Sequence, residues 1–399
     1  MNKTFLTIAF IVTAMHSFNA LAGGDNCGVN CSWTISNGKL KVWATDPNLP
    51  GEIGDFTHYQ NSNKAPWSGS NNITSIEVTG NITKVGSEAF YGVNGNGING
   101  KSTIKSITLP DTITTIGNRG LYGLSSIESL TLPSSLTTIG DEAFYNIRVP
   151  ELTIPPSVNT IGNGAFSSMA SVSTLVIPEG VETIGTQTLA NMSNLTSLTL
   201  PSTLKTIGNE AFYWSKSLET LVIPEGVTSI GYGAFKNMKG LRNLTIPDSV
   251  TSLGNIASIY DTDRLQITNL TIGSENLKRF LCESCSWDAG PNYAFAYEGD
   301  ININCFDGVE NCQRVLDEYV SKLSYTPSWY SRIILNVAQK NEQGNSAGGQ
   351  SNALNPDGSY NIYDADGNII GYRGKRIYTV EEATKLSKPT GNTFRLRYK

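Results

Sequence analysis

Apolar residues recur in one fixed phrase through the middle of the chain. Each copy has an apolar residue and a proline, then two variable residues, another apolar residue, two more variable residues and an Ile-Gly or Leu-Gly pair. Such a period, here 22 or 23 residues, is typical of a solenoid, in which one small unit stacks on the next. The seven copies end at Gly117, Gly140, Gly162, Gly185, Gly208, Gly231 and Gly254.

Within one copy, the pattern predicts a short strand before the proline. Leu221 and Ile223 alternate with Val222, so we expect the first two inside the coil and Val222 outside. Proline lacks an N–H and should end the strand. Gly231 is expected to reverse the chain, most simply with a positive φ. Phe235 should then lie in a short helical or 3₁₀ turn and fill the coil.

We therefore predict an α/β repeat solenoid, rich in β structure, with repeats of about 23 residues, N- and C-terminal caps and a small C-terminal α+β module. Apolar residues at three- and four-residue steps also predict a helix over 307–323, closing the C-terminal end. The expected division is a signal peptide 1–22, a β-rich cap 23–72, a solenoid 73–272, a Cys-containing cap with a helix 273–340, a flexible linker 341–356 and a basic module 357–399.

The repeat pattern Leu-x-x-Leu-x-Ile-Pro-x-x-Val-x-x-Ile-Gly-x-x-Ala-Phe resembles the BspA-type leucine-rich repeat. The segment that precedes it, with Cys27-Gly28, the run 31–35, the run 38–42 and Ala65-Pro66-Trp67, looks like the N-terminal module of that family. The resemblance covers about residues 27–272. It implies a secreted or surface bacterial protein, and some members of the family bind host matrix proteins or other cells.

The first 22 residues have the features of a secretory signal peptide. Lys3 is their only charge, an apolar run covers 5–15, and Ala20-Leu21-Ala22 offers small residues for cleavage after Ala22. The apolar run is short for a membrane span, and no later stretch reaches 18 apolar residues. We expect a secreted or cell-surface protein with no transmembrane segment in the mature chain.

Charge disfavours nucleic acid and anionic lipid as partners. The formal charge is −5, and loss of Lys3 makes it −6. Residues 357–399 hold eight Lys/Arg against five Asp/Glu, which leaves −9 for residues 23–356. A body this acidic should repel other polyanions.

Export makes disulfides the expected state of the six cysteines, Cys27, Cys31, Cys282, Cys285, Cys305 and Cys312. Six cysteines allow fifteen pairings, and proximity favours Cys27 with Cys31. The other four fall in the C-terminal cap. They could instead hold zinc, although the Cys305–Cys312 spacing is too wide for the usual ribbon.

Candidate catalytic chemistry is sparse, and we predict neither enzyme activity nor a cofactor. Only His16 and His58 occur, and His16 leaves with the signal peptide. A Ser-His-Asp site would depend on His58 alone, without a G-x-S-x-G turn. No spacing of carboxylates singles out an acid–base pair.

Two motifs have simpler explanations than ligand binding. The run 95–102 matches G-x-x-x-x-G-K-S, but a repeat strand follows it where a phosphate loop needs a helix, so we expect a flexible loop. The run 364–368, Asp-Ala-Asp-Gly-Asn, resembles a calcium loop, but Lys375 stands where the ligand glutamate belongs. A hairpin turn is expected there.

Outward positions of the repeats form the candidate binding face. The expected residues are Thr108, Thr131, Thr153, Val176, Thr199, Val222, Thr245 and Thr271. Asp111, Glu179, Glu225 and Asp248 follow the prolines as an acidic edge. These features suit a soluble exposed strand, and equally an extended surface for a protein or glycan. Trp33, Trp43 and Trp67 either cover apolar surface in the N-terminal cap or stack on carbohydrate.

Two functions are consistent with these patterns. The first is an exported bacterial leucine-rich repeat protein that binds an extracellular or cell-surface protein, or a glycan, as an adhesin does. The second is a structural envelope protein, in which a self-associating spacer displays the C-terminal module.

Overall fold

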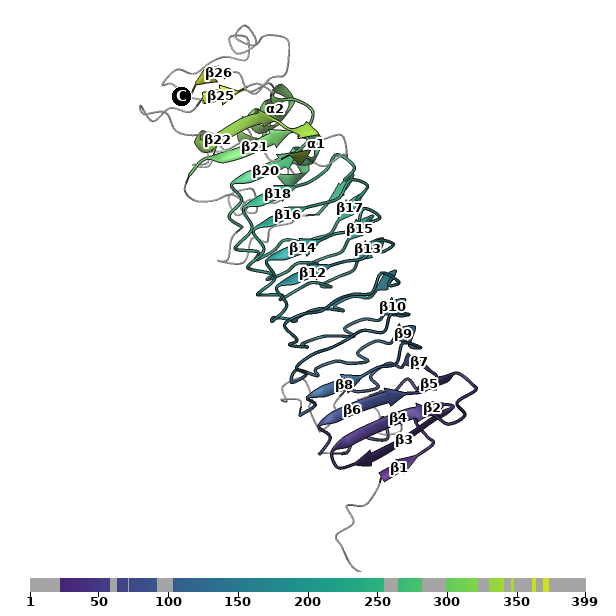
Figure 1. Cartoon of the computed structure of the whole chain (residues 1–399). Helices are drawn as coiled ribbons and strands as arrows, with labels where there is room; N and C mark the ends of the chain where they lie inside the picture. Colours follow the sequence, from purple (N-terminus) through teal and green to yellow (C-terminus); the bar gives the residue numbers. More distant parts are fainter. Residues whose placement is uncertain are drawn as a thin grey trace, which may run out of the picture.

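The computed structural model describes residues 22–57, 63–70, 72–91, 103–254, 265–281, 299–321, 330–340, 346–347, 361–363 and 369–372. Its repeats form one elongated stack of coils, with β1–β5 at one end and α1, α2 and β22 at the other (Figure 1). The fold is a β-rich repeat with few helices. Most coils have two short strands and a side made of turns, and two coils have only the second strand.

The first strand of a coil lies where the sequence predicts it, before the proline, except in two copies, in which 130–132 and 152–154 form no strand. Leu221 pairs in parallel register with Leu244 one coil later. Leu221 and Ile223 are buried, whereas Val222 is exposed. These strands are β6 (Ser75–Thr79), β8 (Ser106–Thr108), β12 (Thr174–Val176), β14 (Ser197–Thr199), β16 (Thr220–Val222), β18 (Asn243–Thr245) and β20 (Asn269–Ile272).

The second strand of each coil carries the isoleucine that precedes the glycine. Ile207 pairs with Ile230, again in parallel register. Both side chains are buried, so this line of strands forms the second wall of the core. Its members are β7 (Ile82–Val85), β9 (Thr115–Ile116), β10 (Thr138–Ile139), β11 (Thr160–Ile161), β13 (Thr183–Ile184), β15 (Thr206–Ile207), β17 (Ser229–Ile230) and β19 (Ser252–Leu253).

The third side of each coil is a run of turns that points a large apolar side chain inward, a phenylalanine in most coils and a leucine at Leu121 and Leu189. The rings of Phe144 and Phe166 stack at 5.7 Å, and those of Phe212 and Phe235 at 5.9 Å. All four are fully buried. Large aromatic rings dominate the apolar area that a core buries, so this column holds the three sides together.

The prediction for the glycine corner is wrong. Gly231 is absent from the residues with positive φ. Its requirement is close approach: a Cβ there would lie 2.5 Å from Asn209 Oδ1 and 2.6 Å from Asn209 N. Gly140 would likewise place a Cβ 2.6 Å from Asn118 N. The corners stack backbone on backbone, and only glycine leaves room for this.

The left-handed residue instead comes two places after the glycine. Glu142 has a φ of 52°, and the next coil has Gly164 there with a φ of 62°. This conformation turns the N–H toward the following coil, so Glu142 N donates to Asn163 O at 2.8 Å and Gly164 N to Thr186 O at 2.8 Å. Bonds between coils thereby satisfy backbone groups that a turn would otherwise leave unpaired.

The N-terminal end adds five strands, β1 (Ala22–Gly24), β2 (Gly28–Val29), β3 (Cys31–Ser36), β4 (Lys39–Ala44) and β5 (Gly51–Ile53). β3 pairs antiparallel with β4, which pairs parallel with β6 of the stack. Trp33 and Trp67 are buried, and Trp67 stacks on Phe90 at 5.6 Å. Its Nε1 donates to Ala89 O at 2.8 Å. These two tryptophans cover apolar surface, whereas Trp43 is half-buried. A disulfide joins Cys27 to Cys31.

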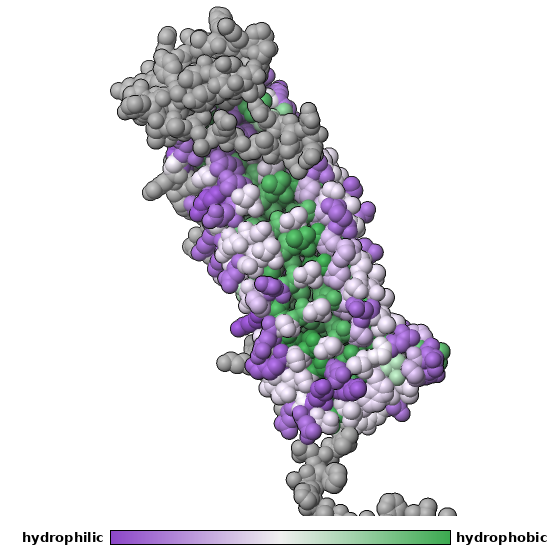
Figure 2. All heavy atoms as spheres, in the orientation of Figure 1, coloured by the Kyte–Doolittle hydropathy of each residue, from purple (hydrophilic) through white to green (hydrophobic). Residues whose placement is uncertain are grey.

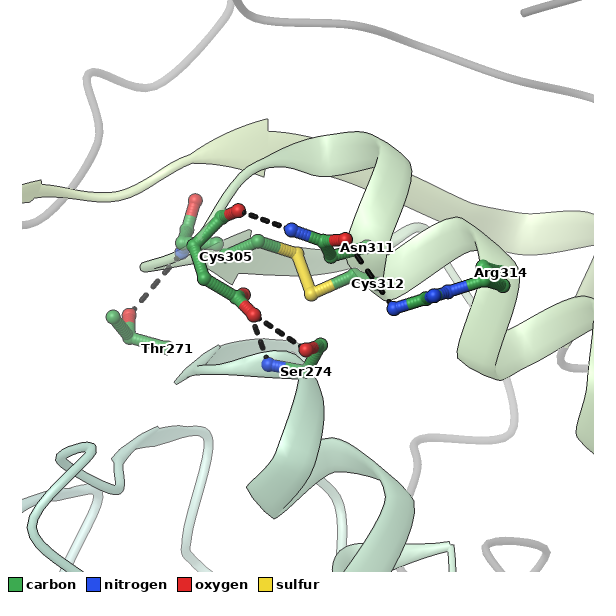
Figure 3. Close-up of a disulfide and its surroundings, with 8 residues drawn as sticks. Thr271, Ser274, Cys305, Asn311, Cys312 and Arg314 are labelled. Carbon is green, nitrogen blue, oxygen red and sulfur yellow. Dashed lines mark hydrogen bonds between the residues drawn. A yellow bond between two sulfur atoms is a disulfide. The ribbon is translucent and has the colours of Figure 1, made fainter.

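The C-terminal end comprises α1 (Ser274–Phe280), β21 (Ile301–Cys305), α2 (Val309–Ser321), the 3₁₀ turn η3 (Tyr330–Arg332) and β22 (Ile333–Val337). β21 and β22 extend the first line of strands in parallel. α2 falls within the predicted helix, whereas α1 was not predicted. The disulfide between Cys305 and Cys312 ties β21 to α2, and Asp307 accepts hydrogen bonds from Ser274 N and Oγ at the start of α1 (Figure 3).

Two further hairpins are described, β23 (Gln339–Lys340) with β24 (Ser346–Ala347), and β25 (Asn361–Tyr363) with β26 (Ile369–Tyr372). The second pairs across the predicted turn at 364–368. Several predictions lie outside the described residues: the signal peptide up to residue 21, His58, the loop 95–102, Cys282 and Cys285, most of the linker, and the rest of the C-terminal module. No helix in the described ranges is long and apolar enough to cross a membrane.

Replacing Gly231 with alanine should destabilise the stack. The added methyl would overlap Asn209 of the preceding coil, and overpacking of this kind costs about 1–3 kcal/mol. Urea unfolding followed by circular dichroism would measure the loss. Gly69→Ala is the matched control, because a Cβ there meets nothing within 4 Å. Equal stability of the two variants would show that the corner has room for a side chain.

Candidate binding surfaces

The residues predicted to form the binding face lie at one outward position of successive coils, six of them in the first strand and Thr131 and Thr153 outside any strand. We call Thr108, Thr131, Thr153, Val176, Thr199, Val222, Thr245 and Thr271 the outer face. Val176 lies directly beside Thr199, and Val222 beside Thr245, in the register of the parallel strands. Six of the eight are exposed, and Thr245 and Thr271 are half-buried.

Two valines make the outer face partly apolar. Val176 is 54% exposed and Val222 is 44% exposed, and one coil separates them. Figure 2 shows apolar residues along the middle of the visible side of the stack, between hydrophilic borders. Six of the eight outer-face residues are threonines, so the two valines supply the larger apolar side chains of that face. The outer face itself has no charged residue. Its hydroxyl and methyl groups therefore offer weak hydrogen bonding and burial of apolar area, without electrostatic steering.

Toward the C-terminal end, the neighbouring outward column changes to asparagine. Asn269 Nδ2 donates to Asn243 Oδ1 at 2.7 Å, and Asn302 Nδ2 to Asn269 Oδ1 at 3.0 Å. These amides bond to one another along the stack, as stacked asparagines do in repeating sheets. The asparagine column therefore links β18, β20 and β21 through side-chain hydrogen bonds. The sequence patterns did not predict this column.

A second hydroxyl column lies on the other line of strands and was also missed. Thr138 pairs with both Thr115 and Thr160 in register, and the buried Ile139 beside it points inward. The signal was present in the sequence, because Thr or Ser precedes each Ile-Gly or Leu-Gly pair. The members are Thr115, Thr138, Thr160, Thr183, Thr206, Ser229 and Ser252.

A polar groove of about 670 Å³ crosses the corner between this second line of strands and the turns. The groove opens over Gly164. The equivalent left-handed residue in the coils on either side has a side chain, whereas Gly164 has none. Glu142 stands on one side and Gln187 on the other. Its lining residues are Ser87, Glu88, Asn118, Arg119, Asp141, Glu142, Asn163, Gly164, Thr186 and Gln187.

Charges in the groove are largely paired along the stack. Arg119 Nε lies 2.7 Å from Glu142 Oε2, and its Nη1 lies 3.6 Å from Glu88 Oε1. Gln187 Nε2 donates to Glu210 Oε2 at 2.6 Å. The guanidinium also lies 5.9 Å from the centre of the Tyr122 ring. These contacts link successive coils, so the residues of the groove stabilise the stack.

Tyrosines beside the groove stack in a short column. The Tyr122 ring lies 4.9 Å from that of Tyr91 and 4.6 Å from that of Tyr145. Burial, and then the neighbouring Tyr145, raise the pKa of Tyr122 well above its ordinary value. The hydroxyl stays protonated at physiological pH, so the column stabilises the stack by packing.

The acidic edge also bonds between coils. Asp111 Oδ1 accepts from Ser134 N at 2.8 Å and from Ser134 Oγ at 3.0 Å. Glu179 accepts in the same way from Ser202 N and Oγ, both at 3.0 Å. The N–H donor of the next coil, followed by the hydroxyl, lowers the pKa of each carboxyl.

Among the described residues, no group of three or more His, Cys, Asp or Glu residues is placed to hold a metal ion. His58, Cys282, Cys285 and Asp364 lie outside the described ranges.

Comparisons with known proteins identify the repeat. The family profile described as the BspA type leucine rich repeat region matches residues 62–107, 96–219 and 205–286, in six copies. No curated protein matches the chain.

Solved structures of bacterial leucine-rich repeat proteins are also similar. A leucine-rich repeat protein from T. pallidum is 17% identical, with 55% of this chain and 88% of that chain covered and a TM-score of 0.33. One from Eubacterium ventriosum is 19% identical, covering 64% and 88%, with a TM-score of 0.35. The pneumococcal vaccine antigen PcpA is 18% identical, covering 79% and 98%, with a TM-score of 0.33.

Acid should destabilise the native protein partly through Asp111 and Glu179. Because folding lowers the pKa of both carboxyls, their contribution is present above the unfolded values of 3.8 and 4.5 and is lost as the pH falls through the folded values. Between about pH 5 and about pH 3, we expect the melting temperature of the Asp111→Asn, Glu179→Gln variant to fall less than that of the natural chain.

The matched control is the Glu151→Gln, Glu219→Gln variant. It removes two exposed carboxylates for which the described residues supply no hydrogen-bond donor. Thermal unfolding across this pH range would compare the three proteins. If the first variant keeps the full acid sensitivity, these bonds between coils do not contribute to stability.

Proposed function

Because the chain belongs to the BspA-type leucine-rich repeat family, we propose that it is an exported, non-catalytic surface protein that binds a macromolecule through the outer face. The observation that carries this proposal is the exposure of Val176 and Val222 on a face without charge. Apolar side chains on a rigid exposed surface favour association with another protein.

The rigidity of that face follows from the strand register. Leu175 pairs with Leu198, and Leu221 with Leu244, and all four pack in or against the core. Within each of these two strand pairs, the outward side chains are consequently held at the spacing of a parallel sheet, about 4.8 Å from one strand to the next. A preorganised surface loses little entropy on binding, which supports useful affinity from modest contacts.

A protein or glycan at a cell surface is the partner that the chemistry favours. The net charge of −5 disfavours nucleic acid. The proposed signal peptide 1–22 supports export, and cleavage after Ala22 would leave Gly23 and Gly24 of β1 paired with β3. In this proposal, the segments 23–72 and 273–340 cap a continuous solenoid over 73–272, and the linker 341–356 joins it to the module 357–399.

The elongated stack favours a second function, that of an envelope spacer. In-register parallel strands make the stack long for its mass (Figure 1). Such a rod can display its C-terminal module away from the cell, or associate with copies of itself. It needs no partner on the outer face, which separates this alternative from the first proposal.

Acidic residues at Val176 and Val222 should weaken binding through the outer face. Val176→Asp, Val222→Asp places two charges where the proposal buries methyl groups, and we expect affinity to fall roughly tenfold or more. Surface plasmon resonance against purified fibronectin, laminin and a mucin would measure it with the full chain. Thr160→Asp, Thr183→Asp adds the same charge on the second line of strands and should leave affinity unchanged.

Equal loss in both variants would indicate a general charge effect and overturn the assignment to the outer face. If the natural chain binds none of these proteins, and light scattering shows assembly that grows with concentration, the spacer function replaces the first proposal.

A further inference from the structure

Two aromatic and two basic side chains form a contiguous cluster on the turn side of the stack. We call Tyr213, Trp214, Lys216 and Lys236 the basic aromatic cluster. Lys216 Nζ lies 3.7 Å from the centre of the Trp214 ring, and Lys236 Nζ lies 5.3 Å from that of Tyr213. The two rings are 6.0 Å apart and tilted by 46°. All four side chains are partly exposed.

The backbone of Trp214 is strained. Its φ is 62°, in the left-handed region. Asparagine adopts this conformation far more readily than a bulky aromatic residue. The equivalent place in the other coils is occupied by small or amide residues, Gly123, Asn146, Ser168, Asn191 and Asn237, each with a positive φ. The fold therefore needs a left-handed residue here, but not a tryptophan.

The indole carries a second cost. Trp214 Nε1 is buried and has no hydrogen-bond acceptor among the described residues, and such an unpaired group is unfavourable. Strain and an orphan donor together are typical of a residue held in place for a function other than stability. The neighbouring coils form the same turn without either cost.

The cluster is basic although the protein is acidic. The turns that follow Gly208 and Gly231, residues 209–218 and 232–241, hold three cations, Lys216, Lys236 and Lys239, against one carboxylate, Glu210, which gives +2 in a chain of net charge −5. The cations therefore predominate on the turn side.

We propose that the basic aromatic cluster binds an anionic oligosaccharide, a sugar that bears a carboxylate or a sulfate. An anion bound to the ammonium of Lys216 would lie next to the indole, because that ammonium already stands over the ring. The apolar faces of sugar rings pack on aromatic side chains, while lysines neutralise the acid group.

The number of charges, together with the sugar rings, distinguishes this ligand from nucleic acid and from an acidic peptide. Nucleic acid has a phosphate at every nucleotide and would bring many charges toward an acidic protein. An oligosaccharide with one acid group brings a single charge to a local basic site. An acidic peptide would use the lysines but gain nothing specific from the two aromatic rings.

This site is separate from the outer face. The cluster lies on the turns that follow Gly208 and Gly231, whereas six of the eight outer-face residues lie in the first strand of a coil. The inference therefore stands whether or not the outer face binds a protein, and the variants that test the two share no residue.

Binding of three related sugars to the full chain tests the proposal. Lactose, sialyllactose and sulfated lactose share one disaccharide and differ in bearing no acid, a carboxylate or a sulfate. Ligand-observed NMR and isothermal titration would give each affinity. We expect at least one acidic sugar to bind roughly tenfold or more tighter than lactose, and the better of the two identifies the acid group.

Three variants assign the site. Trp214→Asn introduces the residue that Asn191 and Asn237 provide in the flanking coils, so the turn is retained. This variant and Lys216→Gln, Lys236→Gln should each weaken binding of the acidic sugar roughly tenfold. Lys105→Gln, Lys205→Gln removes two exposed lysines elsewhere and should change the affinity less than about twofold. Thermal unfolding checks that all three remain folded.

Several outcomes would overturn the proposal. Equal affinity for lactose and both acidic sugars would remove the role of the anion. Full binding by folded Trp214→Asn would leave a general electrostatic attraction without the indole. A poly-glutamate peptide or an oligonucleotide that binds more tightly than either acidic sugar would assign the cluster to another class of ligand.

Discussion

The distance between successive coils is the constraint on which the rest of the structure depends. Parallel strands must lie about 4.8 Å apart, and the corner of each coil has to keep the same spacing although its chain reverses there. A Cβ added to Gly117 would lie 2.7 Å from Ser87 N, and a Cβ added to Gly254 would lie 2.7 Å from Tyr232 N. A side chain at either corner would push two coils apart, so the glycine column fixes the spacing for every side of the stack.

Fixed spacing turns every outward position into a column. Residues one repeat apart become neighbours, as with Arg119 and Glu142, or Asn243 and Asn269. Polar side chains thus bond along the stack at the corner, the acidic edge and the C-terminal strands. The outer face contributes to these bonds at Thr271, whose hydroxyl accepts from Asn304 Nδ2 at 3.3 Å. From Thr108 to Val222 its hydroxyl and methyl groups face solvent.

Sequence patterns predicted the strands because their cause is local and repeated. The alternation at Leu221, Val222 and Ile223 recurs in each copy, and the burial follows it. The glycine was interpreted wrongly because either a positive φ or close packing accounts for a repeated glycine, and only the position of the preceding coil separates the two. Helix α1 was missed because Asp307, 33 residues after Ser274, accepts the hydrogen bonds at its start.

The positions at which one coil departs from the repeat indicate candidate functional residues, because the repeated positions are explained by the packing of the stack. Where Asn191 and Asn237 satisfy a left-handed turn at low cost, Trp214 adds strain and an unpaired indole N–H. The neighbouring coils form the same turn with asparagine. The additional conformational free energy and the unpaired donor can therefore be assigned to the Trp214 residue alone. The sequence showed a tryptophan after Tyr213 but not its backbone conformation, and for that reason the basic aromatic cluster became visible only when the coils were stacked. A repeat fold tolerates such a residue, because coils on both sides hold the strained turn in place.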